Sequence, residues 1–266
     1  MKVKSVRGPV AKHYFRDNQV HAAIAGTVLM LAAAAVVALA PSLRGRAGAP
    51  TLAERMPDGL AALLGVGPGV SFDTAAGHTD AWFLSLAAPL VLCALALPAA
   101  VRAIAGCEAT GEMEWLAAQP IERAQVVVER FVAVVLVTAQ AAVPATIMLV
   151  LGGGIGELEL APGLVAWSMI RVVVLVSLLA AIVMMVSALT GSLDMSVGVA
   201  IAAPIVAFGL ILGGESSARL SPVRWVLGET PAADGGTTIG VLMAVTILAA
   251  CMLIGSAGFQ RRDIIL

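Results

Sequence analysis

Charged side chains are scarce in this sequence. Of its 266 residues, 12% are charged and 60% are hydrophobic, whereas a soluble domain carries roughly 25% charged residues. Lysine occurs only at Lys2, Lys4 and Lys12, and the formal net charge is -1. Because no basic stripe is present, we expect no nucleic-acid partner. The composition therefore indicates a protein of the lipid bilayer rather than a soluble domain with a large core.

Histidine and cysteine are also few, which excludes several kinds of buried chemistry. The histidines lie near or outside the boundaries of the apolar runs, so they supply neither a heme ligand pair, nor an HExxH zinc site, nor a serine–histidine protease dyad within the bilayer. The cysteines show no CxxC spacing, and we expect packed thiols rather than a disulfide or a metal site. These residues are His13, His21, His78, Cys93, Cys107 and Cys251.

Acidic residues and nucleotide-binding loops are also not expected in the membrane region. We place Asp194 in a turn and expect no other acid at membrane depth, which weighs against an aspartyl protease and against ion-coupled transport. A P-loop requires GxxxxGK[ST], and no lysine follows Lys12. The glycine run 152–157 (GGGIGE) follows no strand and is interpreted as a turn. We therefore expect no enzyme activity, cofactor or metal in this chain.

Long apolar runs, in contrast, are abundant. A membrane helix needs about 20 apolar residues. The first run ends in ALA just before Pro41, as a secretory signal would, but its apolar core is longer than that of a signal, and we interpret it as a retained helix. The sequence thus predicts an all-α membrane protein with six transmembrane helices, at residues 21–40, 81–104, 125–151, 164–189, 197–212 and 239–256.

Basic residues predict the orientation, because they flank the spans on the cytoplasmic side. Such residues precede the first run and follow the last, so we expect both termini in the cytoplasm. The chain then divides into an amphipathic segment at 1–20, a transmembrane domain at 21–256 and a tail at 257–266. They are Lys2, Lys4, Arg7, Lys12, Arg16, Arg261 and Arg262. Outer segments are then expected at 41–80, 152–163 and 213–236, and cytoplasmic loops at 105–123 and 190–196. Trp82 and Trp167 fall where the second and fourth runs reach the outer surface.

Two features inside the runs bear on a transport path. The prolines could kink helices around a path or be tolerated bends, since packed neighbours satisfy the freed carbonyls. Arg171, about two turns below the outer end of the fourth run, is expected to be the single charge inside a span. It either lines a substrate path, snorkels outward or makes a structural hydrogen bond. The prolines are Pro89, Pro98, Pro144 and Pro204.

One dense polar stretch, EATGEMEWLAAQPIER at residues 108–123, interrupts the apolar chain. Thr110 is a plausible helix N-cap with Glu112 in the first turn, and Pro120 would end that helix and begin the next. Such a short amphipathic helix either docks into a groove on a soluble partner or solubilises an interfacial loop. Its apolar face would consist of Met113, Leu116 and Ala117, with the bulky Trp115 beside them.

The same stretch resembles the cytoplasmic coupling segment of ABC-2 type transporter permeases. The matching residues are Glu108, Gly111, Glu112, Glu114, Leu116, Pro120 and Arg123. Ser221 and Pro222 are similar to the outer re-entrant region of that family, and FQRRDI at 259–264 resembles its C-terminal ending. The first outer loop, with MPDGLAALLG, resembles that of a subset of bacterial members.

This resemblance implies an ABC-2 (type V exporter-like) permease fold in a bacterial cell membrane. Two permease halves, identical or paralogous, would sit on a pair of ATP-binding cassette ATPases, which bind the ATP and Mg. Closure of the ATPases would push residues 108–123 and tilt the second and third spans. The implied partner contacts are Glu108, Gly111, Glu112, Met113, Glu114, Trp115, Leu116 and Gln119, with Pro120 and Arg123 fixing the angle.

The sequence does not identify the cargo, and it allows two rival functions. A path lined by apolar and small residues favours an amphipathic, lipid-like or drug-like cargo, and export is the usual direction in the family. One rival is a passive channel, which would conduct without nucleotide. The other is a non-transporting subunit that anchors a cassette ATPase to the membrane.

Overall fold

The computed structural model describes residues 9–43, 75–112, 122–155, 161–228 and 238–262, and in these ranges every regular element is a helix. The elements of the first half are α1 (Pro9–Asp17), α2 (Gln19–Leu43), α4 (Ala75–His78), the π-helical η2 (Thr79–Ala87), α5 (Ala88–Val101), the π-helical η3 (Arg102–Gly106) and α6 (Cys107–Ala109). Those of the second half are α8 (Arg123–Ile155), α9 (Pro162–Thr190), α10 (Leu193–Leu212), α11 (Glu215–Ala218), α12 (Pro222–Leu227) and α13 (Thr238–Arg261).

In the described part of the chain, six helical stretches are long and apolar enough to cross a membrane, which confirms the expected all-helical, six-span architecture. Each overlaps one predicted window, and the fifth is indeed the shortest. Several run further than their apolar cores, because a helix continues into polar sequence until a cap or a glycine stops it. The bounds are Gln19–Ala40, Thr79–Ala109, Arg123–Gly153, Pro162–Thr190, Leu193–Leu212 and Thr238–Arg261.

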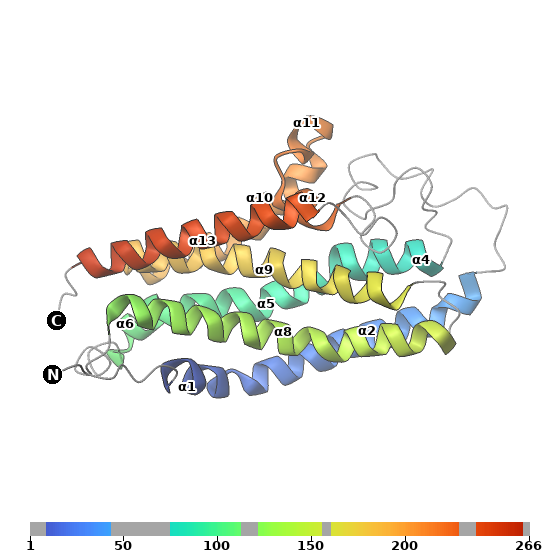
Figure 1. Cartoon of the computed structure of the whole chain (residues 1–266), viewed down its shortest axis with the longest axis horizontal. Coiled ribbons are helices and arrows are strands. Elements are labelled where there is room, and N and C mark those ends of the chain that lie inside the picture. Colours follow the sequence, from blue (N-terminus) through green and yellow to red (C-terminus); the bar gives the residue numbers. More distant parts are fainter. Residues whose placement is uncertain (1–8, 44–74, 113–121, 156–160, 229–237, 263–266) are drawn as a thin grey trace.

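The fourth span, α9, is the central helix of the bundle. It packs against α5, α8, α10, α12 and α13, while α2 packs mainly against α8. Figure 1 shows α9 between α13 on one side and α5 and α8 on the other. The second and fourth spans are the most buried, whereas α10 and α13 leave large apolar side chains exposed, such as Ile205 and Leu253. Such exposed apolar faces are what a lipid environment requires.

The bundle has two distinct ends. At one of them, here called the terminal end, lie the start of α1, the start of α8, α6 and the end of α13 (Figure 1). At the opposite end lie α4, the start of α9 and α12. The basic segments that flank the first and last spans therefore share one end of the molecule, as the sequence predicts.

Proline shapes the second span. Pro89 lies in the first turn of α5 and Pro98 lies inside it, and a π-helical stretch occurs on each side of this helix. Since proline lacks an N–H and clashes with the preceding turn, the helix widens locally near such residues. Pro144 and Pro204 lie inside α8 and α10. Pro144 also borders Gly26, where α2 approaches the backbone of α8 closely.

Some expectations about charge and loops are wrong. Arg171 is not the only charge inside a span, because Arg102, Glu129 and Arg130 lie within span bounds too. Asp80 is buried in η2, so the expectation of no further acid in a span also fails. Asp80 enters the second span because the helix begins before the predicted window at 81–104, whereas Arg102, Glu129 and Arg130 lie near the ends of the predicted windows themselves.

The expected loops are correspondingly shorter. α9 and α10 are joined by residues 191–192 alone, and Asp194 lies in the first turn of α10 rather than in a turn between helices. Likewise, helix persists through Ala109 in the expected 105–123 loop. Thr110 closes α6, and its hydroxyl donates to the Cys107 carbonyl, whereas the sequence suggested that Thr110 begins the next helix.

Candidate functional site

The segment at 108–123, here called the coupling segment, is described at its two ends. Glu108, Gly111, Glu112 and Arg123 lie in the described part of the chain. Gly111 ends the helical path with a φ of 77°, a left-handed conformation that favours glycine. Its N–H donates to the Glu108 carbonyl at 3.2 Å. The other predicted contact residues lie outside the described residues: Met113, Glu114, Trp115, Leu116, Gln119 and Pro120.

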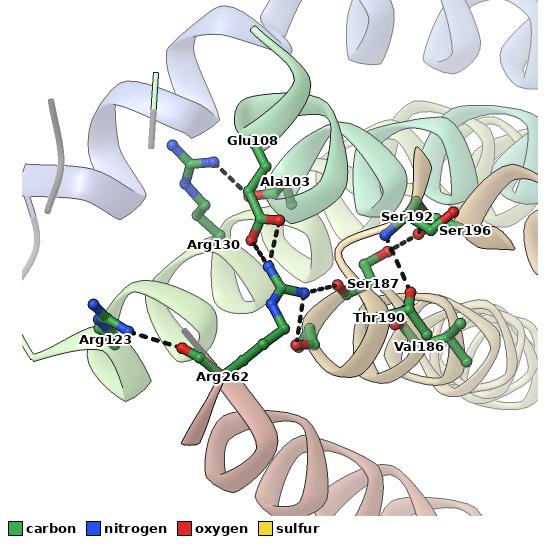
Figure 2. Close-up of polar contacts among 11 residues, drawn as sticks. Ala103, Glu108, Arg123, Arg130, Val186, Ser187, Thr190, Ser192, Ser196 and Arg262 are labelled. Atoms are coloured by element: carbon green, nitrogen blue, oxygen red, sulfur yellow. Dashed lines mark hydrogen bonds and ion pairs between the residues drawn. The ribbon is translucent and has the colours of Figure 1, made fainter. Parts of the chain in front are cut away.

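Arg262, which directly follows α13, joins the second span to the end of the fourth. Its Nη2 donates to both carboxylate oxygens of Glu108. Its Nη1 lies 3.5 Å from the Ser187 carbonyl and 3.3 Å from the Ala188 carbonyl, both in the last turn of α9. Figure 2 shows the guanidinium between these groups. Since the last carbonyls of a helix lack partners within the helix, an arginine here satisfies them and favours the helix dipole.

Arg123 completes this arrangement from the other end of the coupling segment. Its Nη1 donates to the backbone carbonyl of Arg262 at 3.1 Å (Figure 2). The first and last residues of the coupling segment are therefore both bound to Arg262. We call Glu108, Arg123, Ser187, Ala188 and Arg262 the Arg262 cluster.

The neighbouring backbone is fitted to this cluster. Gly191 ends α9 with a φ of 64°, and a Cβ built there would lie 2.4 Å from Nη1 of Arg262. Glycine is therefore required at position 191 for two reasons, the left-handed turn and the close approach of the guanidinium. The guanidinium carbon of Arg262 also lies 5.7 Å from the centre of the Phe259 ring, within cation–π range.

A second polar cluster ties α1, η3 and α8 together around Arg130. The Nη1 group of Arg130 donates to the Ala103 carbonyl and to the Cys107 sulfur, and its guanidinium lies 5.4 Å from the Tyr14 ring centre. The Tyr14 hydroxyl donates to the Ala99 carbonyl. We call these five residues the Arg130 cluster. Burial raises the pKa of Tyr14 to about 12 although Arg102 and Arg130 are nearby, so the phenol stays a neutral donor.

The two clusters are linked through α6. The Cys107 thiol, held by Arg130, donates to the Glu112 carboxylate at 3.1 Å, next to the point where the coupling segment begins. On the other flank, the Ala11 N–H donates to the Glu129 carboxylate at 3.2 Å and fixes α1 to α8. At the terminal end of the bundle, α1 and the second and third spans are therefore cross-linked by hydrogen bonds.

α10 is attached to this end by a hydroxyl pair. The Ser187 and Ser196 hydroxyls lie 2.8 Å apart, and Ser196 donates to the Ser192 carbonyl at 2.7 Å. Ser192 caps α10 by accepting from the Met195 N–H. Because Ser187 also belongs to the turn that Arg262 contacts, α10 is connected to the Arg262 cluster through the same few residues (Figure 2).

Sequence reasoning missed most of these contacts. It noted Glu108, Arg123 and the FQRRDI ending separately, but nothing in the spacing indicated that Arg262 joins them. Arg130 was overlooked, although an arginine seven residues inside a span that continues the coupling segment was a visible signal.

At the opposite end, the structure excludes one of the alternatives for Arg171, the outward snorkelling. The side chain is fully buried rather than snorkelling, and its Nε donates to the Val226 carbonyl of α12. Ser221 begins α12 by accepting from the Val223 N–H and donates to the Ala207 carbonyl at 2.6 Å. α12 is thus tied at its start to α10 and at its end to α9.

The described residues hold no group of three or more histidine, cysteine or acidic side chains that could bind a metal ion. All three cysteines lie in the described part of the chain as free, buried thiols, as their sequence context predicts. The chemistry of the terminal end is therefore that of ion pairs and hydrogen bonds between helices. A comparison with models of known protein families finds no match. A comparison with curated proteins finds no similar sequence.

Proposed function

We propose that this chain is the transmembrane permease subunit of an ATP-binding cassette exporter of the ABC-2 type. In this role residues 108–123 dock on a separate ATPase, and the terminal end of the bundle faces the cytoplasm of a bacterial cell. The observation that carries the proposal is that Glu108 and Arg123, at the two ends of the coupling segment, are both bound to Arg262.

The coupling segment is placed to transmit force from an ATPase to several spans. A displacement of the coupling segment acts on the second span through α6 and on the third through the start of α8. The Arg262 cluster also connects the segment to the ends of α9 and α13. Because packed helices have few intermediate arrangements, such cross-linking favours movement of the inner ends together rather than local bending. A bundle without its own P-loop would then receive mechanical work from a partner that hydrolyses ATP.

The same proposal accounts for the exposed apolar surfaces. α10 and α13 leave apolar faces that neither α9 nor α12 covers, and a second permease half, either a copy or a paralogue, would share this surface with lipid. The path between two such halves suits an amphipathic, lipid-like or drug-like cargo rather than an ion or a sugar.

Affinity purification from native membranes in mild detergent tests the proposal. We expect an ATPase with a P-loop to copurify, and the Trp115→Ala, Glu114→Ala double variant to release it. Trp82→Ala, which truncates an exposed tryptophan at the opposite end, is the matched control and should retain the ATPase. Full retention by the double variant would refute the coupling role.

Two further measurements separate the proposal from its rivals. Nucleotide turnover by the purified complex should rise when amphipathic compounds are added, whereas an anchoring subunit predicts no such rise. Planar bilayers containing the chain alone should show no conductance. Conductance without nucleotide would indicate a channel and contradict the exporter assignment.

A further inference from the structure

Arg171 is the most unusual side chain at the opposite end of the bundle. It lies on α9, roughly 13 Å along the helix from its first residue at 1.5 Å per residue, and it is fully buried. A guanidinium carries five N–H donors. The Nε donor is taken by the Val226 carbonyl, while Nη1 and Nη2 are buried without a hydrogen-bond partner among the described residues.

Burying two donors without acceptors costs folding free energy unless a bound group supplies the acceptors. A buried donor without a partner is destabilising because its hydration is lost without replacement, and the cost is larger when the group is charged. Within a bilayer, water does not lower this cost as it does in a soluble protein. The two Nη groups form the end-on fork of the guanidinium, which matches two oxygens of a phosphate or a carboxylate.

A helix that packs against α9 contributes a buried acid. Asp80 is 1% exposed, and it belongs to η2, which packs against α9. Its negative charge interacts favourably with Arg171. Arg171 and Asp80 therefore contribute one positive and one negative buried charge to the opposite end, and these two charges sum to zero.

We propose that Arg171 and Asp80 bind a zwitterionic phospholipid headgroup, with the phosphate on Nη1 and Nη2 and the ammonium group facing Asp80. A purely anionic headgroup would be repelled by Asp80, whereas a zwitterion matches both charges. Because the guanidinium is enclosed, the headgroup enters when α12 moves away from α9 and the Arg171–Val226 bond opens. That this lipid is also the cargo rests on the proposed exporter function; the binding itself does not.

Lipid retention by the purified chain tests the site. The chain is equilibrated in mixed micelles with equal amounts of phosphatidylethanolamine and phosphatidylglycerol, and bound lipids are counted by native mass spectrometry. The wild-type chain should prefer phosphatidylethanolamine, and Arg171→Gln should lower its retention about tenfold or more, as expected for the loss of charged hydrogen bonds. Asp80→Asn should shift the preference towards phosphatidylglycerol. Arg219→Gln, which changes an exposed arginine at the same end, should leave both unchanged.

The opposite results would overturn the inference. Equal retention of the two lipids by the wild-type chain would do so, as would unchanged retention in Arg171→Gln. If Arg171→Gln fails to fold, Arg171→Lys keeps the charge without the fork, and it should weaken phosphatidylethanolamine retention while Asp80→Asn still reverses the preference. The assay uses the chain alone, so failure to find an ATPase would refute the exporter proposal and leave this result standing.

Discussion

Replacing Arg262 by glutamine should loosen the terminal end of the bundle. The change removes both hydrogen bonds to the Glu108 carboxylate and both contacts with the end of α9. It leaves a carboxylate that is largely shielded from solvent, since the exposed fractions of the Arg262 and Glu108 side chains are 21% and 15%. The perturbation is therefore larger than the loss of an ordinary surface ion pair.

The size of the expected stability loss follows from this intermediate burial. A surface ion pair contributes about 0–1 kcal/mol, and removal of one partner from a fully buried pair costs about 3–5 kcal/mol. For this partly buried pair we expect a loss of about 1–3 kcal/mol. If the Arg262 cluster opens as a local unit, the opening equilibrium should rise roughly 5- to 150-fold.

Hydrogen–deuterium exchange of the chain in lipid nanodiscs measures this opening. Peptides covering Arg102–Gly106 and the end of α9 should exchange faster in Arg262→Gln, while peptides at the opposite end should not change. Arg261→Gln changes the adjacent, exposed arginine and is the matched control. A double-mutant cycle with Glu108→Gln should give a coupling energy of about 1–2 kcal/mol. Equal exchange in the two arginine variants, or additive effects in the cycle, would refute the structural role of Arg262.

Three other predictions concern neighbouring features. Gly191→Ala should destabilise the chain by more than the roughly 1–2 kcal/mol that a left-handed alanine costs, because its Cβ would also displace Arg262. Thermal unfolding should show this loss of stability. The control Gly163→Ala, where a Cβ meets nothing within 4 Å, should not show it. Arg130→Met should remove the cation–π contact between α8 and Tyr14 of α1, and the loosened α1 should become more sensitive to limited proteolysis; unchanged cleavage would contradict the role of the Arg130 cluster. Tyr14 is the only tyrosine of the chain, so tyrosinate absorbance should titrate near pH 12 rather than near pH 10. Its protonated form is favoured in the fold, so the stability that it contributes is present below pH 10 and is lost as the pH rises towards 12; a midpoint near pH 10 would show that the phenol is not buried.

The spans were predictable because apolar length is a local property. Each window of about 20 apolar residues became a helix, and Pro144 and Pro204 fell inside helices as expected. Helix ends were less predictable, since capping depends on a few residues. Thr110 has the chemistry of an N-cap, yet it closes α6 because the positive φ of Gly111 ends the helical path there.

The polar clusters were not predictable for a different reason. Glu108 and Arg262 are far apart in the sequence, and their contact depends on how α13 and α5 pack around α9. Arg171 presented a similar problem. Its position in the fourth span was clear, but whether it snorkels or stays buried depends on α12, a helix of another segment that folds back over it.

Photo-crosslinking at position 115 tests directly whether residues 108–123 dock on an ATPase. A photoreactive amino acid placed there, in native membranes, captures whatever lies against the coupling segment, and mass spectrometry identifies the captured protein. We expect an ATPase with a P-loop, captured from position 115 and absent when the same probe replaces Trp82. Capture of lipid alone, or the same products from both positions, would contradict it.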